Sequence, residues 1–181
     1  VQERNTAHRP IRKVFVMGMG GFSKAAVAQA ALQGVEEIVV ANRMGSKTVP
    51  GFRAFVERLK EKCPQTEVRL IDWDPELWKA ELADADLVAN ATPNGLNGKG
   101  DLEKQFPYAA AADGCIFFDA IYSPLKTAFL AEAEKCGHAI VNGLDLLAHQ
   151  GVCSFKIWTG VEVEPALMRG DALEFMENSH K

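Results

Sequence analysis

The residue pattern best suited to chemistry lies near the start of the chain, in KVFVMGMGGFSKA at residues 13–25. A short apolar run ends in Gly18, Gly20 and Gly21, and an alanine-rich stretch typical of a helix follows. Glycine permits a tight turn and a close approach to a ligand, and backbone N–H groups at a helix start attract anions. The pattern predicts a strand, a glycine turn and a helix that bind a pyrophosphate. The spacing is GxGG rather than GxGxxG, so a simple turn is the alternative.

A second candidate is the loop that follows the apolar run Glu37–Ala41. In a nucleotide-binding sheet this loop meets the adenosine ribose, where an acidic residue would bind the 2′-hydroxyl and repel a 2′-phosphate. The loop begins with Asn42 instead, and Arg43 and Lys47 supply positive charge that suits a phosphate. NADP is therefore favoured over NAD. The alternative for both cations is an ordinary solvated loop.

Polar loops also follow two later apolar runs, at residues 86–89 and 115–119. Open α/β sheets bind ligands at the carboxyl ends of their strands. Thr92, in the first of these loops, is the residue there expected to touch a cofactor. Its alternative role is a hydroxyl that stabilises the turn.

The elements that must position these loops alternate along the chain. Apolar runs of strand length are separated by segments with helical spacing, which predicts a doubly wound parallel six-stranded α/β sheet. The expected strands are 14–17, 37–41, 67–71, 86–89, 115–119 and 138–141, and the expected later helices are 49–63, 74–83, 124–136, 144–158 and 165–178.

Composition excludes several classes of protein. The chain has 181 residues, 48% of them hydrophobic, and a net charge of -4 without a basic cluster. One domain with a sizeable core is expected, and nucleic acid is not expected as a partner. The apolar runs are too short to cross a membrane, so we expect a cytoplasmic protein. The four cysteines lack CxxC spacing, which predicts reduced, mostly buried thiols and no metal site.

The first residues are polar and carry no initiating methionine. We expect residues 1–10 to be a linker or the end of a preceding element of a longer protein. Residues 11–160 are then the nucleotide-binding domain, and residues 161–181 form a C-terminal helix.

Six motifs together resemble one family. In order and spacing they are similar to the NADP-binding half of shikimate and quinate/shikimate dehydrogenases. The motifs are GMGGFSKA, VVANR, ADLVANATPNG, DAIYSPLKTAFLAEAEKCG, VNGLDLLAHQG and FKIWTG. The resemblance covers residues 11–160 and implies a Rossmann-like fold. The family transfers a hydride between nicotinamide and the ring 3-position of shikimate or 3-dehydroshikimate, and some members accept quinate and NAD.

The resemblance also implies roles for single positions. The glycine turn would cradle the pyrophosphate, the loop at 42–47 would surround the adenosine ribose and its phosphate, and later loops would line the nicotinamide path. Met44 departs from the threonine that commonly follows Asn-Arg in the family. The cofactor-binding residues implied are Gly18, Met19, Gly20, Gly21, Phe22, Asn42, Arg43, Met44, Ser46, Lys47, Thr92, Ala120, Ile121 and Gly143.

Two side chains are implied to bind substrate, Tyr122 and Gln150. Their alternatives are a partly buried tyrosine and an ordinary amide on a helix surface. Histidine in general can act as an acid or base near neutral pH, which would suggest a catalytic role for His149. This position does not carry the proton in the family, so we assign it no catalytic role.

The proton donor that reduction of a carbonyl requires is not expected within this chain. In the family it is a lysine paired with an aspartate in an N-terminal substrate domain. We therefore expect no catalytic residue here, and NADP binding without appreciable reduction of 3-dehydroshikimate by the chain alone. Lys126 could replace that donor, but it is interpreted as an ordinary lysine near a helix start. Family members occur as monomers and homodimers.

Three alternatives stay open. One is a quinate/shikimate dehydrogenase that uses NAD, and another is a non-catalytic NADP(H)-binding module. A third is a protein like glutamyl-tRNA reductase, against which DAIYSPLKT and NGLDLLAHQG argue.

Overall fold

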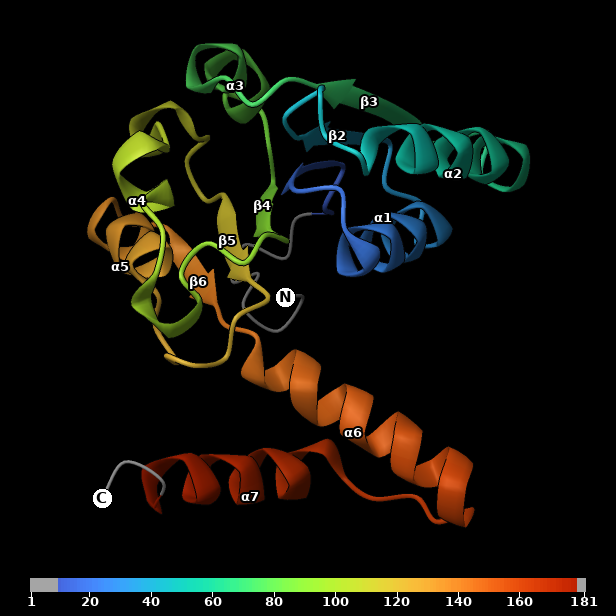
Figure 1. Ribbon diagram of the computed structural model, residues 1–181, viewed down its shortest axis with the longest axis vertical. Helices are drawn as coiled ribbons and strands as arrows, with labels where there is room; N and C mark the ends of the chain where they lie inside the picture. The colour runs from blue at the N-terminus through green and yellow to red at the C-terminus, as the bar shows by residue number, and fades with distance from the viewer. Residues whose placement is uncertain (1–9, 179–181) are drawn as a thin grey trace.

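A six-stranded parallel sheet forms the centre of the protein in a computed structural model that describes residues 10–178. The strands lie in the order β3-β2-β1-β4-β5-β6, so the chain moves outward from β1 to one edge and then returns to build the other (Figure 1). This is the doubly wound, Rossmann-like arrangement that the alternation of elements predicts. The strands are β1 (Lys13–Met17), β2 (Glu37–Ala41), β3 (Glu67–Ile71), β4 (Leu87–Asn90), β5 (Ile116–Asp119) and β6 (Ala139–Val141).

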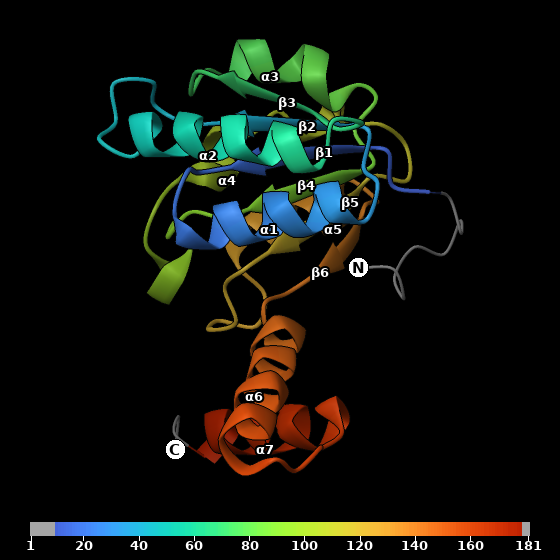
Figure 2. The ribbon, with the colours of Figure 1, turned by 90° about the vertical axis from the view of Figure 1, so that its right-hand side faces the viewer.

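Helices cover both faces of the sheet (Figure 2). On one face lie α1 (Gly21–Leu32) and α2 (Val49–Lys62), and on the other lie α3 (Pro75–Leu82), α4 (Leu102–Gln105) and α5 (Ala128–Lys135). Because both faces are covered, the central strands are buried almost continuously rather than alternately, as β1 shows at all five of its positions. Short 3-10 helices span Leu96–Gly98 and Tyr108–Ala110.

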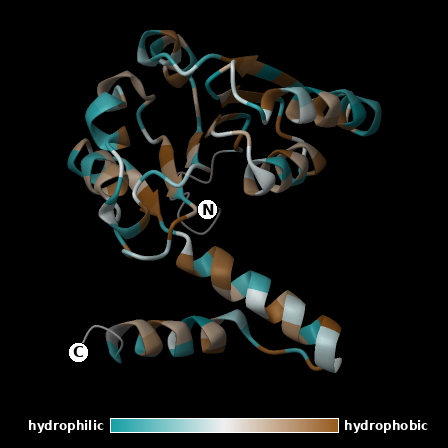
Figure 3. Ribbon diagram, in the orientation of Figure 1, coloured by the Kyte–Doolittle hydropathy of each residue, from teal (hydrophilic) through white to brown (hydrophobic). Residues whose placement is uncertain are grey.

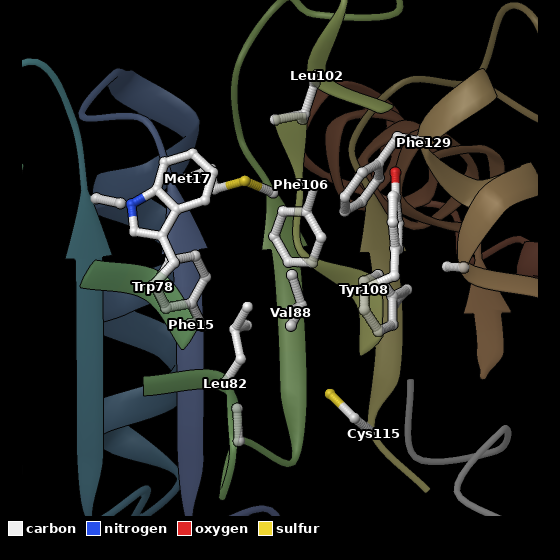
Figure 4. Packing of buried hydrophobic residues seen from close by; sticks show 14 of the residues in the cluster. Phe15, Met17, Trp78, Leu82, Val88, Leu102, Phe106, Tyr108, Cys115 and Phe129 are labelled. Carbon is white, nitrogen blue, oxygen red and sulfur yellow. The ribbon is translucent and has the colours of Figure 1, made fainter. Parts of the chain in front are cut away.

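The larger of two hydrophobic clusters lies under α3, α4 and α5 and is rich in aromatic rings. Trp78 is fully buried and packs edge-on against Phe15, with ring centroids 5.9 Å apart. Phe106 contacts both Trp78 and Phe129, as Figure 4 shows. This packing fixes the face of the sheet opposite α1 and α2.

Two further helices form an arm beyond β6. α6 (Leu144–Thr159) and α7 (Pro165–Asn178) pack against each other and are joined by an ion pair between Arg169 Nε and Asp145 Oδ1, 2.7 Å apart. They extend away from the sheet in both views (Figures 1 and 2), and Figure 3 shows hydrophobic segments along them. Ile157 and Trp158 are 81% and 79% exposed. No helix between residues 10 and 178 is long and apolar enough to span a membrane.

The structure corrects some predicted bounds. The helix expected over 124–136 begins only at Ala128, because Thr127 has an extended backbone and caps it by accepting a hydrogen bond from Leu130 N. The short helix Leu102–Gln105 was not predicted. Of the four free cysteines, Cys136 and Cys153 are exposed, so the expectation of mostly buried thiols is wrong for half of them. The expected linker lies outside the described residues except for Pro10.

Candidate functional site

The predicted site residues meet at the carboxyl edge of the sheet. Hydrogen bonds continue the parallel ladder one residue beyond the strands: Gly18 N donates to Ala41 O at 2.8 Å, and Ala91 N donates to Met17 O at 2.9 Å. Ala120 N, the first residue after β5, likewise donates to Asn90 O at the end of β4. The loops after β1, β2, β4 and β5 therefore leave the sheet side by side.

The glycine turn has the geometry that an anion site needs. Gly18 has φ +103°, and a Cβ there would lie 2.9 Å from Ala91 O and 3.0 Å from Thr92 Cγ2. Gly20 is the N-cap of α1 without a side-chain cap, so the first N–H groups of the helix are free to bind a ligand. A Cβ at Gly20 or Gly21 would meet nothing within 4 Å. The open helix start fits a pyrophosphate.

The side chains beside the turn point into the protein. Met19 is buried among the residues that α1 and α2 cover. Phe22 is half-buried, with its ring centroid 6.1 Å from that of Phe118. Met19 could therefore contact a pyrophosphate only through its backbone.

The loop after β2 presents two unpaired cations. Asn42 N continues the ladder to Ile71 O at 3.1 Å, and Asn42 Nδ2 donates to Thr48 Oγ1 at 3.3 Å. Arg43 and Lys47 are exposed, and neither forms an ion pair with any described residue. Ser46 Oγ lies 3.0 Å from Thr48 Oγ1, so the polar side chains of the loop bond to one another and not to either cation.

An acidic residue from the neighbouring strand contacts the same loop, and it was not predicted from the sequence. Asp72, the first residue after β3, accepts hydrogen bonds from Met44 N at 3.0 Å and Trp73 N at 2.8 Å. These two backbone N–H groups hold the pKa of the Asp72 carboxyl below its ordinary value. A negative charge therefore lies at the backbone of Met44, the residue after Arg43. The signal that could have identified Asp72 is the pairing of β3 with β2, which brings the carboxyl ends of the two strands together.

Thr92 is engaged in its own turn. Its Oγ1 donates to Asn90 Oδ1 at 2.7 Å and accepts from Asn94 N at 3.1 Å. The turn-stabilising role is thus present in the structure, and contact with a cofactor stays a prediction.

Ala120, Ile121 and Gly143 come together after β5 and β6. Ala120 N donates to Asn90 O at 3.1 Å, and Gly143 N donates to Ile121 O at 3.0 Å. A Cβ on Gly143 would overlap the Ala120 carbonyl, so only glycine fits this close approach. The backbones of Ala120, Ile121 and Gly143 are therefore packed directly against one another, and we call these three residues the backbone wall.

The remaining candidates take no part in these contacts. Tyr122 is 41% exposed in the loop after β5, and Gln150 is exposed on α6 beside His149. Neither Tyr122 nor Gln150 hydrogen-bonds through its side chain within the described chain. Lys126 Nζ is paired with Glu134 Oε2 at 2.7 Å, as expected for a surface lysine. No described cluster of residues could hold a metal ion.

Comparison with known proteins agrees with this geometry. A family model described as the shikimate 5'-dehydrogenase C-terminal domain matches residues 143–170. Shikimate dehydrogenase (NADP(+)) of Methanopyrus kandleri is 36% identical over 164 residues, which are 91% of this chain and 55% of that protein. The chain belongs to the shikimate dehydrogenase family. It spans about half the length of the curated relatives that it matches.

Solved structures of the shikimate dehydrogenase family share the fold. Shikimate 5-dehydrogenase of Listeria monocytogenes, in complex with shikimate and NAD, superposes with a TM-score of 0.80 at 30% identity, over 92% of this chain and 58% of that one. The Thermus thermophilus enzyme, in complex with NADP(H) and shikimate, gives a TM-score of 0.68 at 28% identity, over 95% and 59%. Both cofactors therefore occur among structural relatives.

Proposed function

We propose that these 181 residues form the cofactor-binding part of a shikimate dehydrogenase, with residues 11–160 as the NADP-binding domain and residues 161–181 as the C-terminal helix. The observation that carries this proposal is the uncapped start of α1 behind open space at Gly20 and Gly21. Between residues 10 and 178, no atom lies within 4 Å of a Cβ built at Gly20 or Gly21, and the dipole of α1 favours a negative charge there.

NADP is the preferred cofactor in this proposal. The exposed guanidinium of Arg43 is free to bind a 2′-phosphate with paired hydrogen bonds, and Lys47 adds a second charge. The relative from Methanopyrus kandleri carries NADP(+) in its name. Asp72 reduces this preference, because its charge repels the same phosphate, and NAD use is the alternative.

The bound cofactor would supply the hydride. The chain's own residues would orient the ring: the backbone wall of Ala120, Ile121 and Gly143 excludes water from one side of it. Tyr122 and Gln150 would bind hydroxyl and carboxylate groups of shikimate, 3-dehydroshikimate or quinate. The lysine and aspartate that move the proton would come from a substrate domain outside these residues, so the chain alone would reduce little 3-dehydroshikimate.

A second candidate function is a non-catalytic module that binds NADP(H). The observation that favours it is that Lys126, the lysine that follows the loop after β5, is paired with Glu134 and is not free to donate a proton to a substrate. Supplying a substrate domain separates the two functions: a dehydrogenase gains activity with 3-dehydroshikimate and NADPH, and a module does not.

The experiment that tests cofactor binding is a fluorescence titration with NADPH. Gly20 has φ -91°, so alanine fits its backbone, and the added methyl group enters only the open space. Gly20→Ala should weaken NADPH binding about tenfold or more while the melting temperature stays the same. Gly170→Ala, equally open but on α7, is the matched control and should bind as the wild type does. Equal binding by all three proteins would contradict the proposal.

A further inference from the structure

Two polar side chains are buried side by side where β4 and β5 end. Asn90 and Asp119 are the last residues of adjacent strands, occupy the same register position, and are both fully buried. Asn90 Nδ2 donates to Asp119 Oδ1 at 3.1 Å. Burying an amide and a carboxyl group costs free energy unless their hydrogen bonds are made. The other bonds of the pair therefore indicate what the pair does.

The other hydrogen bonds of the Asn90 side chain go to the loop after β4. Its Oδ1 accepts from Thr92 N at 3.0 Å and from Thr92 Oγ1 at 2.7 Å. Its Nδ2 also donates to Asn94 O at 3.0 Å. One side chain thus fixes both ends of the segment that packs against the glycine turn through Thr92 Cγ2.

Asp119 makes the equivalent bonds to the loop after β5. Its Oδ1 accepts from Ile121 N at 3.0 Å, and its Oδ2 accepts from Thr127 Oγ1 at 2.7 Å. Thr127 is the N-cap of α5, so the carboxylate ties the loop to the start of that helix. No basic side chain among the described residues pairs with Asp119.

The two loops that this pair holds also contact each other. A Cβ on Gly95 would lie 3.2 Å from Thr127 Cγ2 and 3.3 Å from Ile121 Cδ1, and Gly95 has φ +102°. Ile121 O in turn receives the N–H of Gly143. Asn90 and Asp119 therefore determine the distance between two parts of the site. One is the backbone of Ala120, Ile121 and Gly143, and the other is the loop that contains Thr92.

We propose that Asn90 and Asp119 are positioning residues for the nicotinamide half of the cofactor. They act through the two loops, because both side chains are fully buried and a ligand cannot reach them. The inference rests on the proposed function, because it assigns the two loops to the nicotinamide path. It also predicts that the adenosine half, held by the glycine turn and the loop at 42–47, binds independently of the pair.

The test uses two ligands, NADPH and 2′-phospho-ADP-ribose, which lacks the nicotinamide. Asp119→Ala should weaken NADPH binding about tenfold, keep 2′-phospho-ADP-ribose within about twofold, and return the emission of bound NADPH to that of free NADPH. Asp119→Asn should keep both affinities within about threefold, because the amide can still accept from Asn90 and Ile121 and donate to Thr127. A purely structural role would affect both ligands equally and would leave the emission unchanged.

A second pair of variants covers the case in which Asp119→Ala does not fold. Thr127→Val removes one hydrogen bond to Asp119 and should weaken NADPH about fivefold, whereas Thr127→Ser should bind as the wild type does. Equal loss of both ligands in the variants, no loss of either, or an Asp119→Asn protein as weak as Asp119→Ala would overturn the inference. A wild-type chain that binds neither ligand would contradict the proposed function as well.

Discussion

The carboxylate of Asp72 accepts a hydrogen bond from the backbone N–H of Met44 at 3.0 Å. The two residues lie 28 positions apart and meet because β2 and β3 pair in register up to Ala41 and Ile71. The acidic residue that is missing from the end of β2 is thus supplied by the neighbouring strand. It lies at the backbone of the residue that follows Arg43, whose side chain is proposed to bind the 2′-phosphate.

Asp72→Asn is expected to increase selectivity for NADPH over NADH by about two- to fivefold. Asparagine retains an oxygen that can accept from Met44 N and Trp73 N, but it removes the charge that repels a phosphate. The two dissociation constants, measured at low salt, give the ratio. Asp72→Ala serves as the comparison, since it removes the hydrogen bonds too and should disorder the loop. An unchanged ratio in Asp72→Asn would show that the carboxylate does not affect the cofactor.

Arg43→Ala is expected to weaken NADPH binding by about 1.5 to 3 kcal/mol, the scale of hydrogen bonds to a charged group. NADH binding should hardly change, because it has no 2′-phosphate. Arg53→Ala is the matched control: Arg53 is an exposed arginine on α2. The assignment of Arg43 is wrong if NADH binds more tightly than NADPH to the wild-type chain.

Asp119 should make stability depend on pH in an unusual direction. Burial raises the pKa of this carboxyl, and the hydrogen bonds from Thr127, Ile121 and Asn90 only partly oppose the effect. A raised folded-state pKa favours the neutral form, so the stabilisation is complete below the unfolded value of about 3.9 and is lost as pH rises through the folded pKa. Asp119→Asn should therefore gain stability relative to the wild type as pH rises above the unfolded value of about 3.9. Urea unfolding at each pH measures this, and a constant difference would contradict it.

Trp78 is expected to contribute more to stability than any exposed tryptophan. It is fully buried and contacts Phe15 and Phe106, so Trp78→Ala should cost about 3 to 5 kcal/mol of unfolding free energy. Trp158→Ala, at a position that is 79% exposed on α6, should change it by about 0.5 kcal/mol or less. Urea denaturation of both variants checks the difference, and similar losses would mean that the α6–α7 arm is part of the core.

The sequence allowed the sheet to be predicted closely because its strands are continuous apolar runs. The predicted bounds of β2 and β3 coincide with Glu37–Ala41 and Glu67–Ile71. The glycine turn was also predictable, since Gly18 has a positive φ that favours glycine, and glycine after an apolar run is a local signal for such a turn. These features depend on neighbouring residues only.

The features that were missed depend on contacts between distant segments. Asp72 reaches Met44 only through the pairing of β2 with β3, and Thr127 ends the loop after β5 because its hydroxyl bonds to Asp119. The short helix Leu102–Gln105 has too few residues to show a period, and it is held by burial of Leu102 and Phe106 in the aromatic cluster. Local patterns carry no information on such contacts.

The most direct test of the account is a crystal structure of the chain soaked with NADPH. The account predicts the diphosphate at the start of α1, within hydrogen-bonding distance of backbone N–H groups after Gly20, and the 2′-phosphate against Arg43. A well-ordered cofactor elsewhere, or a glycine turn that stays empty at saturating NADPH, would contradict it.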